Sequence, residues 1–122
     1  MRLLRIALAT LVLLGLMSAP VAARRRTFAS NLTRISEQTD GEFVVAISGR
    51  VTSRQPKCVS GREIRVRLEG ADIFYGAATT DANGNFTVEG TGPRDQLYRI
   101  SLLKAKIGGS TCGPDTVVDE LG

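Results

Sequence analysis

Residues 79–88 have the sequence Thr-Thr-Asp-Ala-Asn-Gly-Asn-Phe-Thr-Val, and this stretch decides the fold of the chain. Asn83 and Gly84 both tolerate a positive φ, which a tight hairpin turn needs. After them, Phe86 and Val88 alternate with polar residues, as in a strand that buries one of its faces. The stretch therefore predicts a β-hairpin with its turn at Asn83 and Gly84.

Strand patterns of the same kind occur on both sides of this turn. Loops marked by glycine and proline separate them, and no ten-residue window after residue 23 has the 3.6-residue period of a helix. The expected strands lie at residues 28–35, 42–51, 62–69, 73–79, 85–89, 97–107 and 115–121. Many short strands with turn signals between them predict an all-β sandwich or barrel.

The N-terminus has the form of a secretion signal. Two arginines precede the apolar residues 6–17, and small residues follow, with Val21 and Ala23 at the positions that signal peptidase recognises. The apolar run is shorter than the ~20 residues that a membrane-spanning helix needs. We therefore expect residues 1–23 to be a cleaved signal peptide. The rival hypothesis is a retained anchor, with Arg24–Arg26 as a stop-transfer flank.

The remaining chain is long enough for one domain and not for two. Residues 24–41 are polar and poorly periodic, so we expect a flexible N-terminal segment there, with at most a short edge strand. The pattern sharpens at residue 42, and the β-domain is expected to occupy residues 42–122. A domain of this size buries a modest core, so a covalent link stabilises it usefully.

The net charge of +4 comes mainly from the N-terminus and does not describe a basic domain surface. The chain has 16 basic and 12 acidic residues, and Arg2, Arg5 and Arg24–Arg26 supply five of the basic ones. Without them the chain is close to neutral. We therefore expect no nucleic-acid binding, and no stable membrane insertion once the signal has been removed.

Cys58 and Cys112 are the only cysteines. In a chain that is exported to an oxidising compartment, an even pair predicts one intramolecular disulfide. Closing a loop of this length contributes roughly 4 kcal/mol on the chain-entropy model. The alternative is two free thiols, one of them a nucleophile. The chain has neither a Cys-x-x-Cys spacing nor a histidine to lower a thiol pKa, and both absences disfavour it.

Two motifs resemble the carboxypeptidase-regulatory-like domains. The first is Ile47-Ser48-Gly49-Arg50-Val51, and the second is Thr80-Asp81-Ala82-Asn83-Gly84-Asn85-Phe86; Tyr98 in a later strand also fits. The resemblance implies a Greek-key β-sandwich of about seven strands, of the transthyretin type. It also implies an accessory or adhesive module in an exported or cell-surface protein, here standing alone, with no catalytic zinc site.

The residue inventory disfavours catalysis. The chain contains no histidine, which removes Ser-His-Asp and Cys-His chemistry and His-containing zinc sites. Asp81, Asn83 and Asn85 are spaced like the start of a calcium loop, but the glycine falls two positions early and Gly92 stands where the last carboxylate should be. We therefore expect a plain turn, no metal site, no cofactor and no enzyme activity.

Function is then expected to depend on surface recognition. Arg65 and Arg67 alternate with inward-facing apolar residues, and the Arg65/Arg67 face, with the loops around Pro56 and Pro114, is the expected contact with a protein or cell-surface partner. Phe74 and Tyr75 are adjacent, so one ring points outward in a strand. That surface supports the alternative hypothesis of a small-ligand or carbohydrate binder. The sequence leaves the partner and the oligomeric state open.

Overall fold

The computed structural model of the chain describes residues 26–122. The predicted signal peptide, residues 1–23, lies outside the described residues. The described part contains ten strands and one short 3-10 helix, and no helix in it is long and apolar enough to cross a membrane. The strands are β1 (Arg26–Phe28), β2 (Ser30–Asp40), β3 (Phe43–Ser53), β4 (Glu63–Leu68), β5 (Ile73–Thr79), β6 (Asn85–Pro93), β7 (Gln96–Leu102), β8 (Ala105–Ile107), β9 (Ser110–Cys112) and β10 (Asp115–Leu121), and the helix is η1 (Pro56–Cys58).

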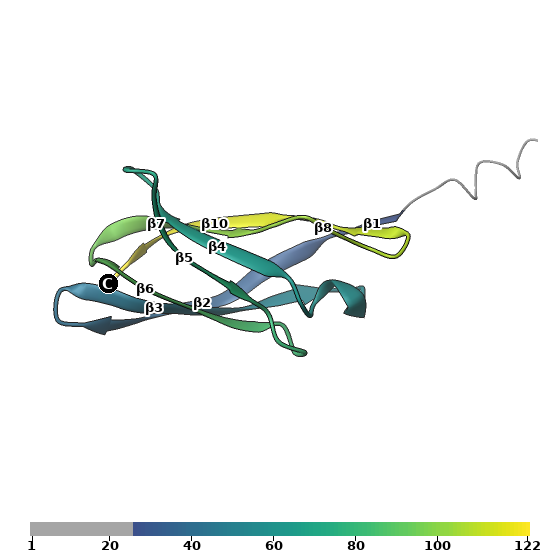
Figure 1. Cartoon of the computed structure of the whole chain (residues 1–122), viewed down its shortest axis with the longest axis horizontal. Coiled ribbons are helices and arrows are strands. Elements are labelled where there is room, and N and C mark those ends of the chain that lie inside the picture. The colour runs from purple at the N-terminus through teal and green to yellow at the C-terminus, as the bar shows by residue number, and fades with distance from the viewer. Residues whose placement is uncertain (1–25) are drawn as a thin grey trace, which may run out of the picture.

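Two antiparallel sheets form the body of the molecule (Figure 1). One has four strands in the order β10-β7-β4-β5, and the other has three in the order β2-β3-β6. The chain crosses between the sheets after β3, after β5 and after β6, so that β3 pairs with β6 and β4 pairs with β7. This connectivity is of the Greek-key kind, and it confirms the predicted all-β sandwich.

A third, smaller sheet accounts for the strands beyond the seven expected. It has the order β1-β9-β8, with β1 parallel to β9. The predicted long strand at residues 97–107 is divided into β7 and β8, which belong to different sheets. β7 ends at Leu102, Leu103 donates its backbone N–H to the Glu63 carbonyl, and after β8 the chain turns back at Gly108 (φ 62°) to form β9. Residues 110–112, expected as loop, are therefore a strand.

Residues 24–41 do not form the expected flexible segment where the structure describes them. β2 runs for eleven residues and pairs with β3 along its length, and Leu32 on it is part of the core. The pairing register shifts between Thr33 and Ser36, where Arg34 has φ 56°. This bulge breaks the alternation of side chains, which explains why the period-2 pattern is weak here.

The core lies between the two main sheets and consists mostly of β-branched and aromatic side chains. Burying each of these contributes roughly 1.5–3 kcal/mol. Its fully buried members include Val44, Ile47, Val51, Ile64, Val66, Val88, Tyr98 and Ile100. On β4 and β7 they occupy alternate positions, as the sequence predicts for a sandwich with two solvent-facing outer surfaces, whereas on β3 the phase changes at a register shift between Val44 and Ala46.

The turn at Asn83 and Gly84 exists, but it does not close a hairpin. β5 and β6, which it joins, belong to different sheets, so it is a crossover. Gly84 has φ 86°, as predicted, whereas Asn83 does not have a positive φ. Asp81 fixes the turn, because its Oδ1 accepts from the backbone N–H groups of Asn83 (2.8 Å) and Asn85 (2.9 Å). The potential calcium ligand is therefore used as a turn cap.

Candidate functional site

The outer surface of the four-stranded sheet brings together most of the predicted binding residues. Four side chains lie directly opposite one another on adjacent strands and cross the whole sheet; we call them the outer row. They are Phe74 on β5, Arg67 on β4, Arg99 on β7 and Val118 on β10. All four are exposed, Phe74 to 53%. The row juxtaposes an aromatic ring, two guanidinium groups and an aliphatic side chain.

Two like charges face each other in this row, which is unfavourable unless they are compensated. Each of the two arginines forms an ion pair with a different carboxylate. Arg99 makes two short bonds to Glu69, from Nε to Oε1 and from Nη2 to Oε2, both 2.6 Å. Arg67 donates from Nη1 to Asp72 at 3.3 Å. The hydrogen bond from Arg99 lowers the pKa of Glu69, and the same bond raises the pKa of Arg99. The two bonds to Glu69 hold the guanidinium plane of Arg99 in place, whereas the longer contact with the exposed Asp72 leaves Arg67 freer.

The aromatic ring at one end of the outer row lies close to the neighbouring guanidinium group. The guanidinium carbon of Arg67 lies 6.0 Å from the centroid of the Phe74 ring, at the limit of a cation–π contact. Leu97, half exposed, lies on the same face one row further along β7. Of the five large apolar side chains exposed in residues 26–122, three are therefore on this one face: Phe74, Leu97 and Val118.

Arg65 lies on the same face, one row away from Arg67 and opposite Ser101 and Ala77. Its Nε donates to Glu63 at 2.8 Å. Both side chains are about half exposed, so the pair contributes little to stability. The structure thus brings Arg65, Arg67 and Phe74 together. The loops around Pro56 and Pro114 lie at the end of the sandwich where β4 begins, away from the outer row.

Tyr75, the fourth predicted binding residue, is not on this surface. Its side chain is only 7% exposed and packs edge-on against Tyr98, with ring centroids 5.5 Å apart. Its hydroxyl donates to the Val44 carbonyl at 3.0 Å. Burial, with a smaller effect of Tyr98, raises the pKa of Tyr75 to about 12. The prediction of a surface formed by both Phe74 and Tyr75 is therefore wrong, because the second ring belongs to the core.

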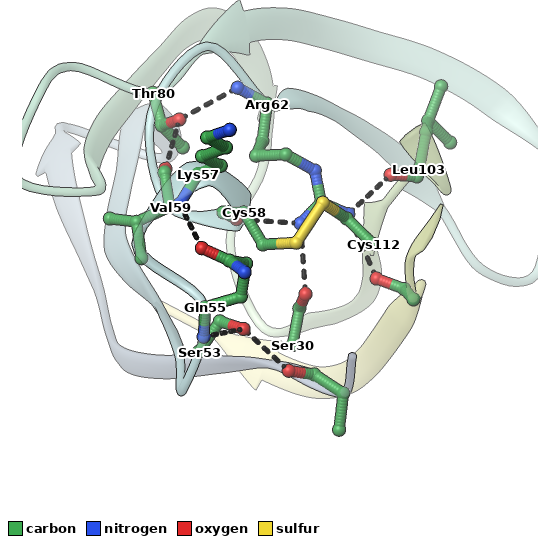
Figure 2. Close-up of a disulfide and its surroundings, with 12 residues drawn as sticks. Ser30, Ser53, Gln55, Lys57, Cys58, Val59, Arg62, Thr80, Leu103 and Cys112 are labelled. Atoms are coloured by element: carbon green, nitrogen blue, oxygen red, sulfur yellow. Dashed lines mark hydrogen bonds between the residues drawn. A yellow bond between two sulfur atoms is a disulfide. The ribbon is translucent and has the colours of Figure 1, made fainter. Parts of the chain in front are cut away.

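Cys58 and Cys112 form the predicted disulfide, which links η1 to β9 (Figure 2). Their Cα atoms are 5.4 Å apart. The bond joins the small third sheet to the loop that follows β3. It therefore closes the end of the sandwich at which β4 begins.

A buried arginine beside the disulfide is the main feature that sequence reasoning missed. Arg62 is fully buried, and its guanidinium donates four hydrogen bonds of 2.8–2.9 Å, three to backbone carbonyls and one to a hydroxyl (Figure 2). The acceptors are the carbonyl oxygens of Cys58, Leu103 and Gly113 and the hydroxyl of Ser30. Burial lowers the pKa of Arg62. The guanidinium thus connects four separate segments.

The signal for Arg62 was present in the alternation of β4. Ile64 and Val66 point inward, and Arg62 lies two positions before Ile64, so it has the same phase. The same rule places Arg99 outward, because its neighbours Tyr98 and Ile100 are buried. Within residues 26–122, no group of three or more His, Cys, Asp or Glu side chains could hold a metal ion.

No protein-family model, no curated protein and no solved structure matches this chain. The outer row therefore stands on its own geometry. Aromatic residues and arginine are enriched in protein–protein interfaces and in their energetic hot spots, so this combination is typical of a recognition surface.

Proposed function

We propose that this chain is an exported, non-catalytic β-sandwich module that binds a partner protein through the outer face of its four-stranded sheet. The outer row is the observation that carries the proposal. It combines Phe74 and Val118, which are exposed and apolar, with Arg67 and Arg99, which are each paired with a carboxylate. The two bonds to Glu69 orient Arg99 before binding, which reduces the entropy that a partner must overcome.

Export is part of this proposal and has two supports. The N-terminal 23 residues have the composition of a secretion signal. The Cys58–Cys112 disulfide is of the kind that persists in oxidising compartments. The transthyretin-type classification, which rests on the motifs around Gly49 and Asn83, belongs to the same proposal.

The carbohydrate alternative has less support. Sugar-binding platforms commonly stack a ring on an exposed aromatic face, and of the two predicted rings only Phe74 is exposed. A protein partner uses the whole outer row, including both arginines, whereas a sugar would use one end of it.

A pull-down with matched variants tests the proposal. The protein is immobilised and exposed to the secreted and envelope fractions of its source. The test variant is Arg67→Gln with Phe74→Ser, which removes one charge and one ring from the outer row. The control variant is Arg34→Gln with Ile73→Ser, which removes one charge and one apolar side chain at exposed positions outside the outer row.

The expected result is a captured protein that is lost with the test variant and kept with the control. All four positions are exposed, so both variants should unfold within about 1 kcal/mol of the parent. Equal capture by both variants would place the binding surface elsewhere. Retention on a glycan array that depends on Phe74 alone would favour the carbohydrate alternative.

A further inference from the structure

The two ends of the long axis of the molecule, which Figure 1 shows, carry side chains of opposite charge. One end carries the β2–β3 turn, the β4–β5 turn, the β6–β7 turn and the end of β10, and we call it the acidic end. Its acidic residues are Asp40, Glu42, Asp72, Asp95, Asp119 and Glu120. The opposite end carries β1, η1 and the β8–β9 turn, and we call it the basic end. Its basic residues are Arg26, Arg54, Lys57, Lys104 and Lys106.

The acidic residues at the basic end, and Arg94 at the acidic end, form hydrogen bonds or ion pairs within the chain. At the basic end, Asp81 accepts two backbone bonds in its own turn, Asp115 accepts the Leu32 N–H at 2.7 Å, and Glu63 is paired with a neighbouring arginine. At the acidic end, Arg94 donates to backbone oxygens at 3.1 Å and 2.7 Å. Of the majority charges at the two ends, only Asp72 forms an ion pair within residues 26–122, with Arg67.

The basic end contains an open hollow of about 490 Å³ whose lining includes two arginines. It is lined by Arg26, Thr27, Phe28, Ala29 and Arg54, and Phe28 provides a half-buried apolar ring. Neither arginine forms an ion pair within the described part of the chain. The lining is held in place, because the Ser53 hydroxyl donates to the Ala29 carbonyl at 2.8 Å and β1 pairs with β9.

The acidic end has a projecting turn of matching chemistry. Asp40 and Glu42 flank Gly41 in the β2–β3 turn, and Phe43, which follows, is half exposed. Arg94 stabilises this turn with two hydrogen bonds. Its backbone N–H donates to the Glu42 carbonyl and its Nη1 to the Gly41 carbonyl, both at 3.1 Å. The turn therefore presents two carboxylates and a phenyl ring on a fixed backbone.

We propose that this protein associates head to tail with further copies of itself. The β2–β3 turn of one copy enters the hollow of the next, so that Asp40 and Glu42 face Arg26 and Arg54 and the Phe43 ring lies against Phe28. The two surfaces differ and lie at opposite ends, so the contact is heterologous and continues into chains or closes into rings. This contact does not involve the outer row, so it does not depend on the proposed sheet-face partner.

Sedimentation of the protein purified from cells that express the full chain tests this directly. At low salt, the average mass should rise with concentration beyond that of two copies. Raising the ionic strength from about 0.1 M to about 1 M shortens the Debye length from about 10 Å to about 3 Å, and should return the protein to the monomer. A protein that stays monomeric at low salt, or that stops at a dimer, would overturn the proposal.

Charge reversal at one end at a time provides a second, sharper test. Arg26→Glu with Arg54→Glu replaces both positive charges of the hollow with negative ones, and Asp40→Lys with Glu42→Lys makes the β2–β3 turn basic. Each variant alone should associate more than about tenfold more weakly than the parent, because like charges then meet. An equimolar mixture of the two should associate again, since each end regains an opposite partner.

The matched control is Arg34→Glu with Arg65→Glu, which reverses two exposed arginines on the two main sheets, outside both ends and the outer row. Its self-association should equal that of the parent. Failure of the mixture to associate, or an equal loss in this control, would exclude the end-to-end contact. Capture of the sheet-face partner is scored separately, so either proposal can fail without the other.

Discussion

At the scale of single residues, Arg62 has an unusual combination of burial and bonding. Its positive charge has no carboxylate partner. Instead, Nη1 and Nη2 donate to three main-chain carbonyls and one hydroxyl. Its Nε is the one buried side-chain polar atom of the described residues that has no partner. Such a group stabilises the fold through the acceptors that it satisfies, because those acceptors would otherwise be buried without donors.

Replacing Arg62 with methionine should therefore cost about 3 kcal/mol or more of unfolding free energy. The change keeps the aliphatic volume but leaves the carbonyls of Cys58, Leu103 and Gly113 without the donors that they now have. Urea unfolding with the disulfide intact measures it. Arg65→Met, on the exposed face of the same strand, is the control and should lie within about 0.5 kcal/mol of the parent. An Arg62→Met protein as stable as this control would show that the bonds are energetically neutral.

How far sequence reasoning reached is clearest at this scale. Alternation correctly placed Ile64 and Val66 inside and Arg65 outside. It gave the phase of Arg62 as well, but a charged residue at an inward position is rarely buried, and only the tertiary structure shows acceptors converging on it. Alternation could not decide between Phe74 and Tyr75. The register shift after Val66 sets which ring faces inward, and no local pattern encodes a bulge.

At the scale of elements, the crossover between β5 and β6 packs closely against β3. Gly84 has φ 86°, and its carbonyl accepts the Val51 N–H at 2.8 Å. A Cβ added at Gly84 would collide with the Val51 carbonyl oxygen and lie 2.8 Å from Val59 Cγ1. The turn therefore needs glycine for two reasons, its dihedral angle and the closeness of β3.

A series of glycine-to-alanine changes separates these two reasons. Gly84→Ala combines strain and collision and should cost more than about 2 kcal/mol. Gly41→Ala has a positive φ (65°) but open space, so it should cost about 1 kcal/mol. Gly70→Ala has neither problem and should leave stability unchanged or raise it slightly. Thermal or urea unfolding gives the order, and equal effects at Gly84 and Gly41 would exclude the collision.

The elements that sequence analysis missed share one property. β1, β8 and β9 have three residues each, too few to show a period, and β1 finds its partner more than eighty positions away, as in the pairing of Arg26 with Ser110. The longer strands were located because their periodicity extends over six residues or more. Local periodicity does not show which sheet a strand joins. The predicted hairpin at Asn83 and Gly84 was wrong because β5 and β6 lie in different sheets.

At the scale of the whole molecule, two tyrosines connect the sheets by polar bonds. Tyr75 on β5 donates across the core to the Val44 carbonyl on β3, and Tyr98 on β7 donates to the Pro93 carbonyl on β6 at 2.6 Å. Burial raises the pKa of both hydroxyls. Neither bond survives ionisation of the tyrosine, since a phenolate has no proton to donate.

Alkaline pH should therefore weaken the sandwich. The ordinary tyrosine pKa is 10.0, and that of folded Tyr75 is about 12, so the folded state holds its proton more tightly than the unfolded state. The resulting stability is complete below about pH 10 and is lost as the pH rises towards about 12; a shift of this size corresponds to roughly 2–3 kcal/mol. Urea unfolding across this range measures it.

Tyr75→Phe is the matched variant for the alkaline experiment. At neutral pH it should lose about 1 kcal/mol with the Val44 hydrogen bond. Above about pH 10 its stability should fall less steeply than that of the parent, because the group that titrates has been removed. Parallel curves for the two proteins would assign the alkaline loss to other residues.

The third sheet also sets the order in which the chain can reach its final form. β1 begins at the first described residue, yet its pairing partner β9 ends only at Cys112. The same cysteine closes the disulfide with Cys58. A chain that leaves the ribosome N-terminus first therefore holds β1 unpaired with β9, and Cys58 without its disulfide partner, until Cys112 has emerged. The small sheet and the disulfide can consequently form only as late steps, after residue 112 has been delivered.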